Sequence, residues 1–138
     1  MGSATVRYLL DTNICIYIAK HSPPAVRERF AQISADSLSM SVITLGELRY
    51  GAEKSQMRVR SLEIIRQLEA LIQIAPMNED TAHHYGDIRS SLERAGRPIG
   101  NNDLWIAAHA RSNGWTLVTN NEREFNRVEG LAVENWAA

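Results

Sequence analysis

The sequence predicts an α/β fold in which a short, mainly parallel sheet is covered by helices on both faces. Short apolar runs alternate with longer segments of helical periodicity, the pattern expected of strands joined by helical crossovers. Hydrophobic residues make up 44% of the chain and charged residues 22%, as in ordinary globular proteins. A length of 138 residues fits one domain, residues 1–138. In such folds ligands bind beyond the carboxyl ends of the strands.

The first half of the chain is expected to hold two strands and four helices. Val6 to Leu10 is an apolar run, and the Asp-Thr-Asn after it begins a helix capped by Thr12 or Asn13. Residues 1–5 are expected to be an added or unstructured start. The predicted elements are a strand over 6–10, helices over 14–20 and 24–35, a strand over 39–43, and an antiparallel helix pair over 44–55 and 61–72.

The second half continues the alternation. Asn78 is followed by two acidic residues, which predicts a capped helix start, and Gly96 ends that helix after Ala95. The predicted elements are a strand over 72–75, a helix over 79–95, a loop over 97–102, a helix over 103–112, and strands over 116–119 and 131–134.

Three acidic residues stand where the chain enters or leaves these elements: Asp11, Glu47 and Asp103. Each has a structural alternative: an Asx turn at Asp11, a capping box between Thr44 and Glu47, or compensation of the helix dipole at Asp103. Strand ends and helix starts gather at one edge of an α/β sheet, however, and gathered carboxylates repel one another unless they hold a hard cation. The sequence therefore predicts a metal-dependent enzyme.

Other chemistries lack their motifs. The single Cys15 excludes an intrachain disulfide and a thiolate zinc site. Ala52 stands where a phosphate-binding loop needs lysine, and the histidines show no metal-ligand spacing, so they are interpreted as structural or exposed. The net charge is −1, and arginine dominates the basic residues, so a nucleic-acid surface has to be a local arginine patch. The absence of a membrane-length apolar run and of a signal pattern favours a cytoplasmic protein.

Five segments together resemble the PIN-domain toxins of the VapC family. These segments are Tyr8–Asn13, Ser41–Gly51, Gly96–Ala110, Thr119–Phe125 and Val133–Trp136. Their order and spacing carry the resemblance, which runs from about residue 6 to residue 136. It implies a PIN-like three-layer sandwich and a magnesium-dependent endoribonuclease, with Mn²⁺ able to substitute. It also implies a toxin of a toxin–antitoxin pair that cleaves structured RNA, with tRNA as a common substrate class.

The resemblance also implies roles for single residues. Asp11, Glu47 and Asp103 would be the catalytic, metal-binding carboxylates. The family often has a fourth acidic residue where this chain has Asn121, and Glu124 is expected to take its place as a catalytic residue. The supporting or phosphate-contacting residues would be Thr12, Asn13, Thr119, Asn121, Arg49 and Arg97, with Arg89 as a further candidate that a solvated helix face explains equally well.

The expected mechanism is in-line attack on an RNA phosphodiester by a metal-activated water, leaving 5′-phosphate products. A homodimer is expected from the family and from the apolar helix pair over 45–72. The resemblance adds an antitoxin whose C-terminal segment packs over the site, with a basic side chain meeting the carboxylates. Two alternatives remain: a catalytically weak PIN domain that serves with its antitoxin as a binding or corepressor module, which Asn121 favours, and a hydrolase of another phosphoester.

Overall fold

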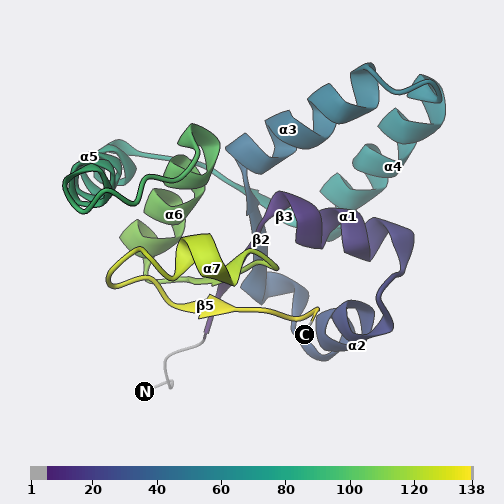
Figure 1. Ribbon diagram of the computed structural model, residues 1–138. Coiled ribbons are helices and arrows are strands. Elements are labelled where there is room, and N and C mark those ends of the chain that lie inside the picture. Colours follow the sequence, from purple (N-terminus) through teal and green to yellow (C-terminus); the bar gives the residue numbers. More distant parts are fainter. Residues whose placement is uncertain (1–5, 138) are drawn as a thin grey trace.

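The computed structural model describes residues 6–137, so the expectation for residues 1–5 lies outside the described part (Figure 1). Five strands form one sheet in the order β3-β2-β1-β4-β5, and every neighbouring pair is parallel. The strands are β1 Tyr8–Leu10, β2 Leu38–Ser41, β3 Gln73–Ala75, β4 Thr116–Val118 and β5 Val133–Glu134. The predicted parallel α/β sheet is confirmed.

Helices form the outer two layers. Within residues 6–137 they are α1 Thr12–Lys20, α2 Pro24–Gln32, α3 Val42–Glu53, α4 Arg58–Leu71, α5 Glu79–Arg94, α6 Asn101–Asn113 and α7 Glu122–Phe125, with a 3-10 turn at Ala35–Ser37. Figure 1 shows α3 and α4 as a projecting antiparallel pair, with α5 and α6 on the other side of the molecule. No helix in this part of the chain is both long and apolar enough to cross a membrane.

Alternating side chains of the central strand divide the core between the two faces of the sheet. Tyr8 and Leu10 of β1 pack with residues of α1, α2, α3 and α4, whereas Leu9 packs with residues of α5, α6 and α7. This is the period of two expected of a strand whose faces are both covered. The three-layer sandwich is thereby confirmed, and the buried sheet holds the ends of its strands in fixed positions.

The register brings particular strand ends together. Leu10 at the end of β1 pairs with Met40 of β2 and Val118 of β4. In the sequence, Asp11 directly follows the end of β1, and Thr119 directly follows the end of β4. Both therefore lie at the carboxyl edge of the sheet, where α1 begins.

Two helix starts differ from the sequence prediction. Helix α1 is capped by Asp11 itself, whose Oδ1 accepts a hydrogen bond from the Ile14 amide at 3.0 Å, so the prediction of Thr12 or Asn13 as the cap was wrong. Helix α3 begins at Val42 because the hydroxyl of Ser41 caps it, accepting a hydrogen bond from the Ile43 amide at 3.1 Å.

The early start of α3 decides between two interpretations of Glu47. Since Ser41 is the cap, Thr44 lies inside the first turn and its side chain is fully buried. The capping box between Thr44 and Glu47 does not form. Glu47 is left in the middle of the helix, with its carboxylate free for other partners.

Smaller differences have local causes. Helix α2 ends at Gln32 because Ile33 is extended, and α6 begins two residues before Asp103, with Gly100 as its cap. The last strand is shorter than predicted and covers only 133–134, and the four-residue helix α7 was not predicted. The capped start of α5 is confirmed, because Asn78 and Thr81 exchange side-chain and backbone hydrogen bonds.

Candidate active site

Asp11 stands at the junction of β1 and α1 and is 6% exposed. Its carboxylate is held by the amide of Ile14, and its own amide donates to the Val118 carbonyl of β4 at 3.0 Å. Burial raises the pKa of Asp11, hydrogen bonds from Thr119 and from backbone amides oppose that rise, and the negative charge of Glu47 adds to it. Asp11 is thus a fixed, desolvated carboxylate close to a second acidic group.

Glu47 links three helices through its two carboxylate oxygens. Oε1 accepts a hydrogen bond from the hydroxyl of Thr12 in α1. Oε2 accepts from the side-chain amide of Asn102 in α6 at 3.2 Å. The side chain of Glu47 is half-buried, so α1, α3 and α6 hold this carboxylate between them at the mouth of the site.

Asp103 lies in the first turn of α6 and is half-buried. Its pKa is raised to about 6, first by burial and then by the negative charges of Glu124, Glu47 and Asp11, in that order. The structure therefore brings together four carboxylates from four separate segments, close enough for the charges of the other three to act on Asp103. Asp103 and Glu47 also line an open hollow of 430 Å³ formed with residues 100–102.

Helix α7 supplies the fourth carboxylate together with Asn121. The side-chain amide of Asn121 donates to Glu124 Oε2 at 3.1 Å, and its backbone amide donates to Thr119 Oγ1 at 2.9 Å. Asn121 therefore orients Glu124 while Thr119 ties both to the end of β4. The two residues proposed to share one role from sequence are in direct contact.

The donor set fits a hard divalent cation. Burial and the charges of nearby carboxylates raise the pKa of Asp11 and of Asp103, so both gain from a cation that neutralises them. Magnesium prefers such oxygen ligands while retaining several waters. Within residues 6–137 no three acidic, histidine or cysteine side chains are close enough together to form a ready-made cage. Glu47 and Glu124 are instead hydrogen-bonded to neighbouring side chains.

Comparison with known proteins identifies the family of the chain. The family model of the PIN domain matches residues 8–131. The chain belongs to the PIN-domain family. The PIN domain is a nuclease fold, and the chain's curated relatives place it among the VapC ribonuclease toxins.

Two relatives and one solved structure illustrate the similarity. The tRNA(fMet)-specific endonuclease VapC of Shigella flexneri is 48% identical over 132 residues, which cover 96% of this chain and 99% of that protein. Ribonuclease VapC2 of Haemophilus influenzae is 45% identical over 131 residues, 95% and 98% of the two chains. The crystal structure of DNA-bound VapBC from Salmonella typhimurium has a TM-score of 0.89 at 41% identity, covering 96% and 99%.

The remaining polar candidates of this PIN domain fall into two groups. Thr12 and Thr119 contact the carboxylates, as described above. Asn13 donates to Asn120 at 3.3 Å, and Asn120 donates to the hydroxyl of Tyr17 at 2.8 Å. The side chain of Asn13 thus joins the start of α1 to the loop after β4, whereas its backbone amide is one of those that bond to the Asp11 carboxylate.

The arginine candidates lie outside the carboxylate group. Arg49 pairs with Glu69 of α4 at 2.7 Å and is exposed. Arg97 is exposed in the loop before α6, and its backbone amide donates to the Leu92 carbonyl. The structure does not bring either guanidinium to the carboxylates. Arg97 nevertheless lies in the loop that leads into α6 and Asp103.

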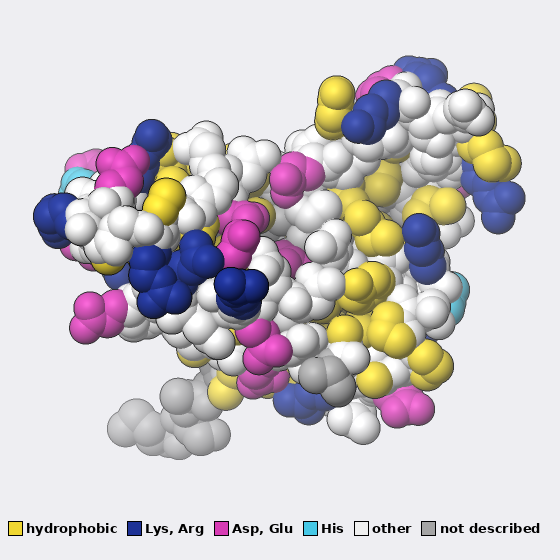
Figure 2. All heavy atoms as spheres, in the orientation of Figure 1, with side chains coloured by type: hydrophobic (Ala, Val, Ile, Leu, Met, Phe, Trp, Pro, Cys, Tyr) yellow, Lys and Arg dark blue, Asp and Glu magenta, His cyan; other side chains and the backbone are white. Residues whose placement is uncertain are grey.

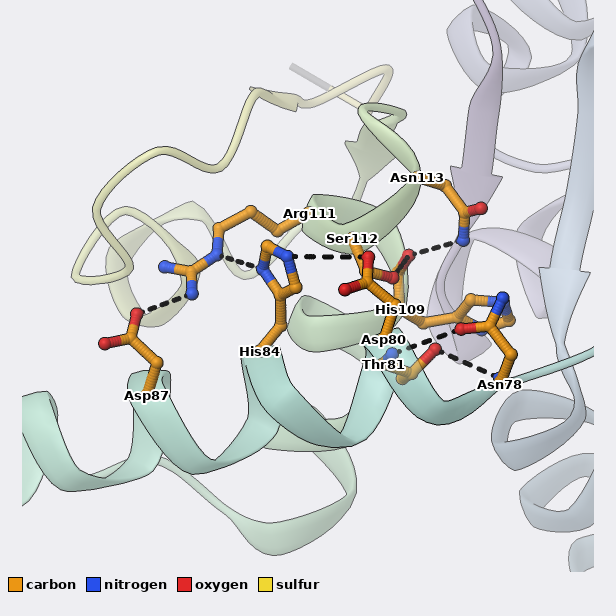
Figure 3. Close-up of polar contacts among 9 residues, drawn as sticks. All are labelled: Asn78, Asp80, Thr81, His84, Asp87, His109, Arg111, Ser112 and Asn113. Carbon is orange, nitrogen blue, oxygen red and sulfur yellow. Dashed lines mark hydrogen bonds and ion pairs between the residues drawn. The ribbon is translucent and has the colours of Figure 1, made fainter.

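The histidines are structural or exposed, as expected: His84 and His109 lie in packed positions, whereas His21 and His83 are exposed. His109 is fully buried, its ring bonds to the Pro76 carbonyl at 3.1 Å, and burial lowers its pKa. His84 accepts from the Arg111 guanidinium at 2.8 Å, and Arg111 also donates to Asp87 at 2.6 Å, which lowers the pKa of that carboxyl (Figure 3). This network joins α5 to α6 and thereby fixes the helix that carries Asp103.

Proposed function

We propose that this PIN domain is a magnesium-dependent endoribonuclease toxin that cleaves structured RNA, with tRNA as its substrate class. The observation that carries the proposal is the convergence of Asp11, Glu47, Asp103 and Glu124 at one edge of the sheet. We further propose that Asp11, Glu47 and Asp103 hold the cation and that Mn²⁺ substitutes for Mg²⁺. We place this activity in the cytoplasm.

The chain's own residues would orient the reaction. A divalent cation bound here supplies a water of lowered pKa and neutralises charge on the scissile phosphate. Asp11 is fixed by its amide contacts, so it can hold its oxygen in one direction without reorganisation. Thr12 and Asn102 hold Glu47 in the same way. In-line attack with departure of the 3′-hydroxyl would leave a 5′-phosphate.

The names of the relatives support RNA as the substrate. The Shigella flexneri relative is named a tRNA(fMet)-specific endonuclease, and the Haemophilus influenzae relatives are named ribonucleases. The open hollow beside Glu47 and Asp103 is accessible to a nucleic-acid strand. Figure 2 shows Lys and Arg side chains gathered next to acidic ones on this face, over the region of α7. A local basic patch of this kind compensates for the net charge of −1.

Metal removal tests the proposed function directly. Purified protein incubated with total tRNA and Mg²⁺ should produce discrete fragments with 5′-phosphates. A chelator should abolish cleavage, and added Mg²⁺ or Mn²⁺ should restore it, because the carboxylates alone activate no water. Fragment ends are read by ligation and sequencing. Cleavage that persists in chelator, or fragments with 5′-hydroxyls, would exclude the proposed mechanism.

An antitoxin has a suitable surface on this chain. A hollow of 320 Å³ runs between α1, α3 and α4, is lined mainly by apolar side chains, and reaches Thr12 and Glu47 at one end. Figure 2 shows hydrophobic side chains concentrated between the α3–α4 pair and the α1–α2 region. We propose that the cognate antitoxin lies in this hollow and places a basic side chain beside the carboxylates. The similar structures from Salmonella typhimurium and Haemophilus influenzae are VapBC complexes, which supports an antitoxin as the partner.

We also propose a homodimer formed through exposed apolar residues of α3, α4 and the turn between them. Tyr50, Met57 and Val59 are 66%, 58% and 81% exposed. The free protein should sediment as a dimer at micromolar concentration. Val59→Arg should shift it toward a monomer that keeps its fold, because Val59 is 81% exposed in the single chain. Sedimentation of the wild type as a monomer would rule out the dimer.

A second role has its own observation. The structures of VapBC from Salmonella typhimurium and Rickettsia felis were both determined bound to DNA. Asn121 is neutral at the position where the resemblance to the VapC toxins implies a fourth acidic residue. The chain could therefore act with its antitoxin as a DNA-bound corepressor in addition to cleaving RNA. If the toxin–antitoxin complex carrying Asp11→Asn binds its promoter DNA as tightly as the wild-type complex, this role is independent of catalysis.

A further inference from the structure

An aromatic pair lies next to the carboxylate site and takes no part in the proposed metal chemistry. Tyr85 of α5 and Trp105 of α6 stack with ring centroids 3.9 Å apart and an interplanar angle of 18°. Both side chains are half-buried, so part of each remains accessible to solvent. Aromatic faces at a protein surface are where unpaired nucleobases stack.

The pair is connected to the site through the first turn of α6. Asn101 and Trp105 are four residues apart on that helix and therefore share one of its faces. The hydroxyl of Tyr85 donates to the side-chain oxygen of Asn101, which lines the same hollow as Glu47 and Asp103. The pair is therefore within one side chain of the space where the scissile phosphate would lie.

Arg89 adds a positive charge to the same place. Its guanidinium donates to the hydroxyl of Tyr85 at 2.8 Å and to Glu93 at 3.0 Å, and lies 6.0 Å from the Tyr85 ring centroid. Arg89 is exposed, and it lines a second hollow of 170 Å³ that shares Asn101 with the first. Stacked rings beside a guanidinium match a nucleotide, which offers a base to the rings and a phosphate to the charge.

We propose that Tyr85 and Trp105 form a stacking platform for an unpaired RNA base beside the scissile phosphate, with Arg89 contacting that nucleotide's phosphate. This inference rests on the proposed ribonuclease function and adds a substrate-positioning site to it. A pair that only packs α5 against α6 would affect stability and leave RNA affinity unchanged. Tyr85 also packs against the buried core residues that join these helices, among them Ile88, Leu92 and Leu104, so the test below changes Trp105 instead.

Binding to a cleavage-deficient protein tests the platform without turnover. In the Asp11→Asn background, the anisotropy of a fluorescein-labelled single-stranded hexa-adenylate RNA should rise on titration with the protein and give the dissociation constant of each variant. Adding Trp105→Leu should weaken binding about 5- to 150-fold, the equivalent of about 1–3 kcal/mol for one stacked base. Trp105→Phe retains an aromatic face and should lose less affinity. An unchanged dissociation constant in the Leu variant would overturn the proposal.

Trp115→Leu is the matched control. Trp115 is also half-buried, but it precedes β4 and therefore lies at the edge of the sheet opposite the carboxyl ends. Its ring contacts Arg7 and His109 rather than any site residue. The Trp115→Leu variant should bind the hexa-adenylate with the affinity of the protein that keeps Trp115. Equal losses in the Trp105 and Trp115 variants would also overturn the platform, because they would show a general effect of removing tryptophan.

Removing the base from the substrate gives an independent test on the unmodified enzyme. In an RNA that the wild type cleaves, one abasic nucleotide beside the cleavage site should raise KM several-fold more than kcat falls. For the Trp105→Leu variant, KM for the abasic RNA should equal KM for the intact RNA. If the wild type cleaves RNAs with an abasic nucleotide at any flanking position as well as intact RNA, the platform is wrong, but the ribonuclease function stands. Failure of the wild type to cleave any RNA would instead reject the ribonuclease function.

Discussion

Asp11→Asn should reduce RNA cleavage by at least about 100-fold, the upper end of what changes in the surroundings of a metal ligand cost. A neutral amide removes one charged ligand from the carboxylate group and leaves the side chain in place. Asn caps helices as well as Asp does, so the hydrogen bond from the Ile14 amide to the side-chain oxygen is retained. Initial rates on tRNA under saturating Mg²⁺ measure the loss. Wild-type turnover in this variant would remove Asp11 from the catalytic set.

The stability of the same variant has a predicted sign. The pKa of Asp11 is raised in the folded protein, so the ionised carboxylate opposes folding above its folded pKa. Without metal, the melting temperature of Asp11→Asn should therefore equal or exceed that of the wild type at pH 7.5. This advantage should disappear as the pH falls through the folded pKa toward the unfolded value of 3.8, where wild-type Asp11 also becomes neutral.

Asp11→Ala and added magnesium separate the cap from the charge. Alanine removes the charge and also the helix cap, which costs about 1 kcal/mol, so this variant should melt below Asp11→Asn. Mg²⁺ should raise the melting temperature of the wild type more than that of either variant, because a cation stabilises the folded state only where it binds. A melting temperature of Asp11→Asn well below wild type would mean that Asp11 is structural.

The fold could be predicted because its signals are local. Apolar runs such as residues 6–10 are too short to be buried helices, and their alternation with helical segments allows few arrangements other than a covered parallel sheet. Boundaries depended on competing caps. Thr44 and Glu47 match a capping box in sequence, but Ser41 caps the helix because its hydroxyl meets an earlier amide and Thr44 is buried in the core.

The site could be predicted only in outline. Asp11 could be proposed as a site residue because it follows a strand, and strand ends gather at one edge of the sheet. The hydrogen bond between Asn102 and Glu47 joins side chains 55 residues apart and depends on how α6 packs beside α3. The stack of Tyr85 on Trp105 depends in the same way on the packing of α5 on α6. Helix α7 has only four residues, too few to show helical periodicity, and its signal was the acidic pair Glu122 and Glu124 in its first turn.

Glu124→Gln should lower cleavage and raise the Mg²⁺ concentration required for half-maximal activity. Glu124 is the largest charge contribution to the raised pKa of Asp103, so its carboxylate lies near the others and adds to their attraction for a cation. Glutamine retains the size and a side-chain oxygen for the hydrogen bond from Asn121. The change should therefore act through charge rather than through the fold. Rates measured across a magnesium titration give both quantities.

Asn121→Asp is the complementary change. The amide of Asn121 now donates to Glu124 at 3.1 Å, and an aspartate would replace that donor by a second negative charge. Two carboxylates at this separation repel one another unless a cation lies between them. The variant should therefore lose stability in chelator, regain it with Mg²⁺, and require less Mg²⁺ for activity than the wild type. If Glu124→Gln leaves the rate and the metal dependence unchanged, the site is Asp11, Glu47 and Asp103 alone, and Glu124 serves only to bind the Asn121 amide.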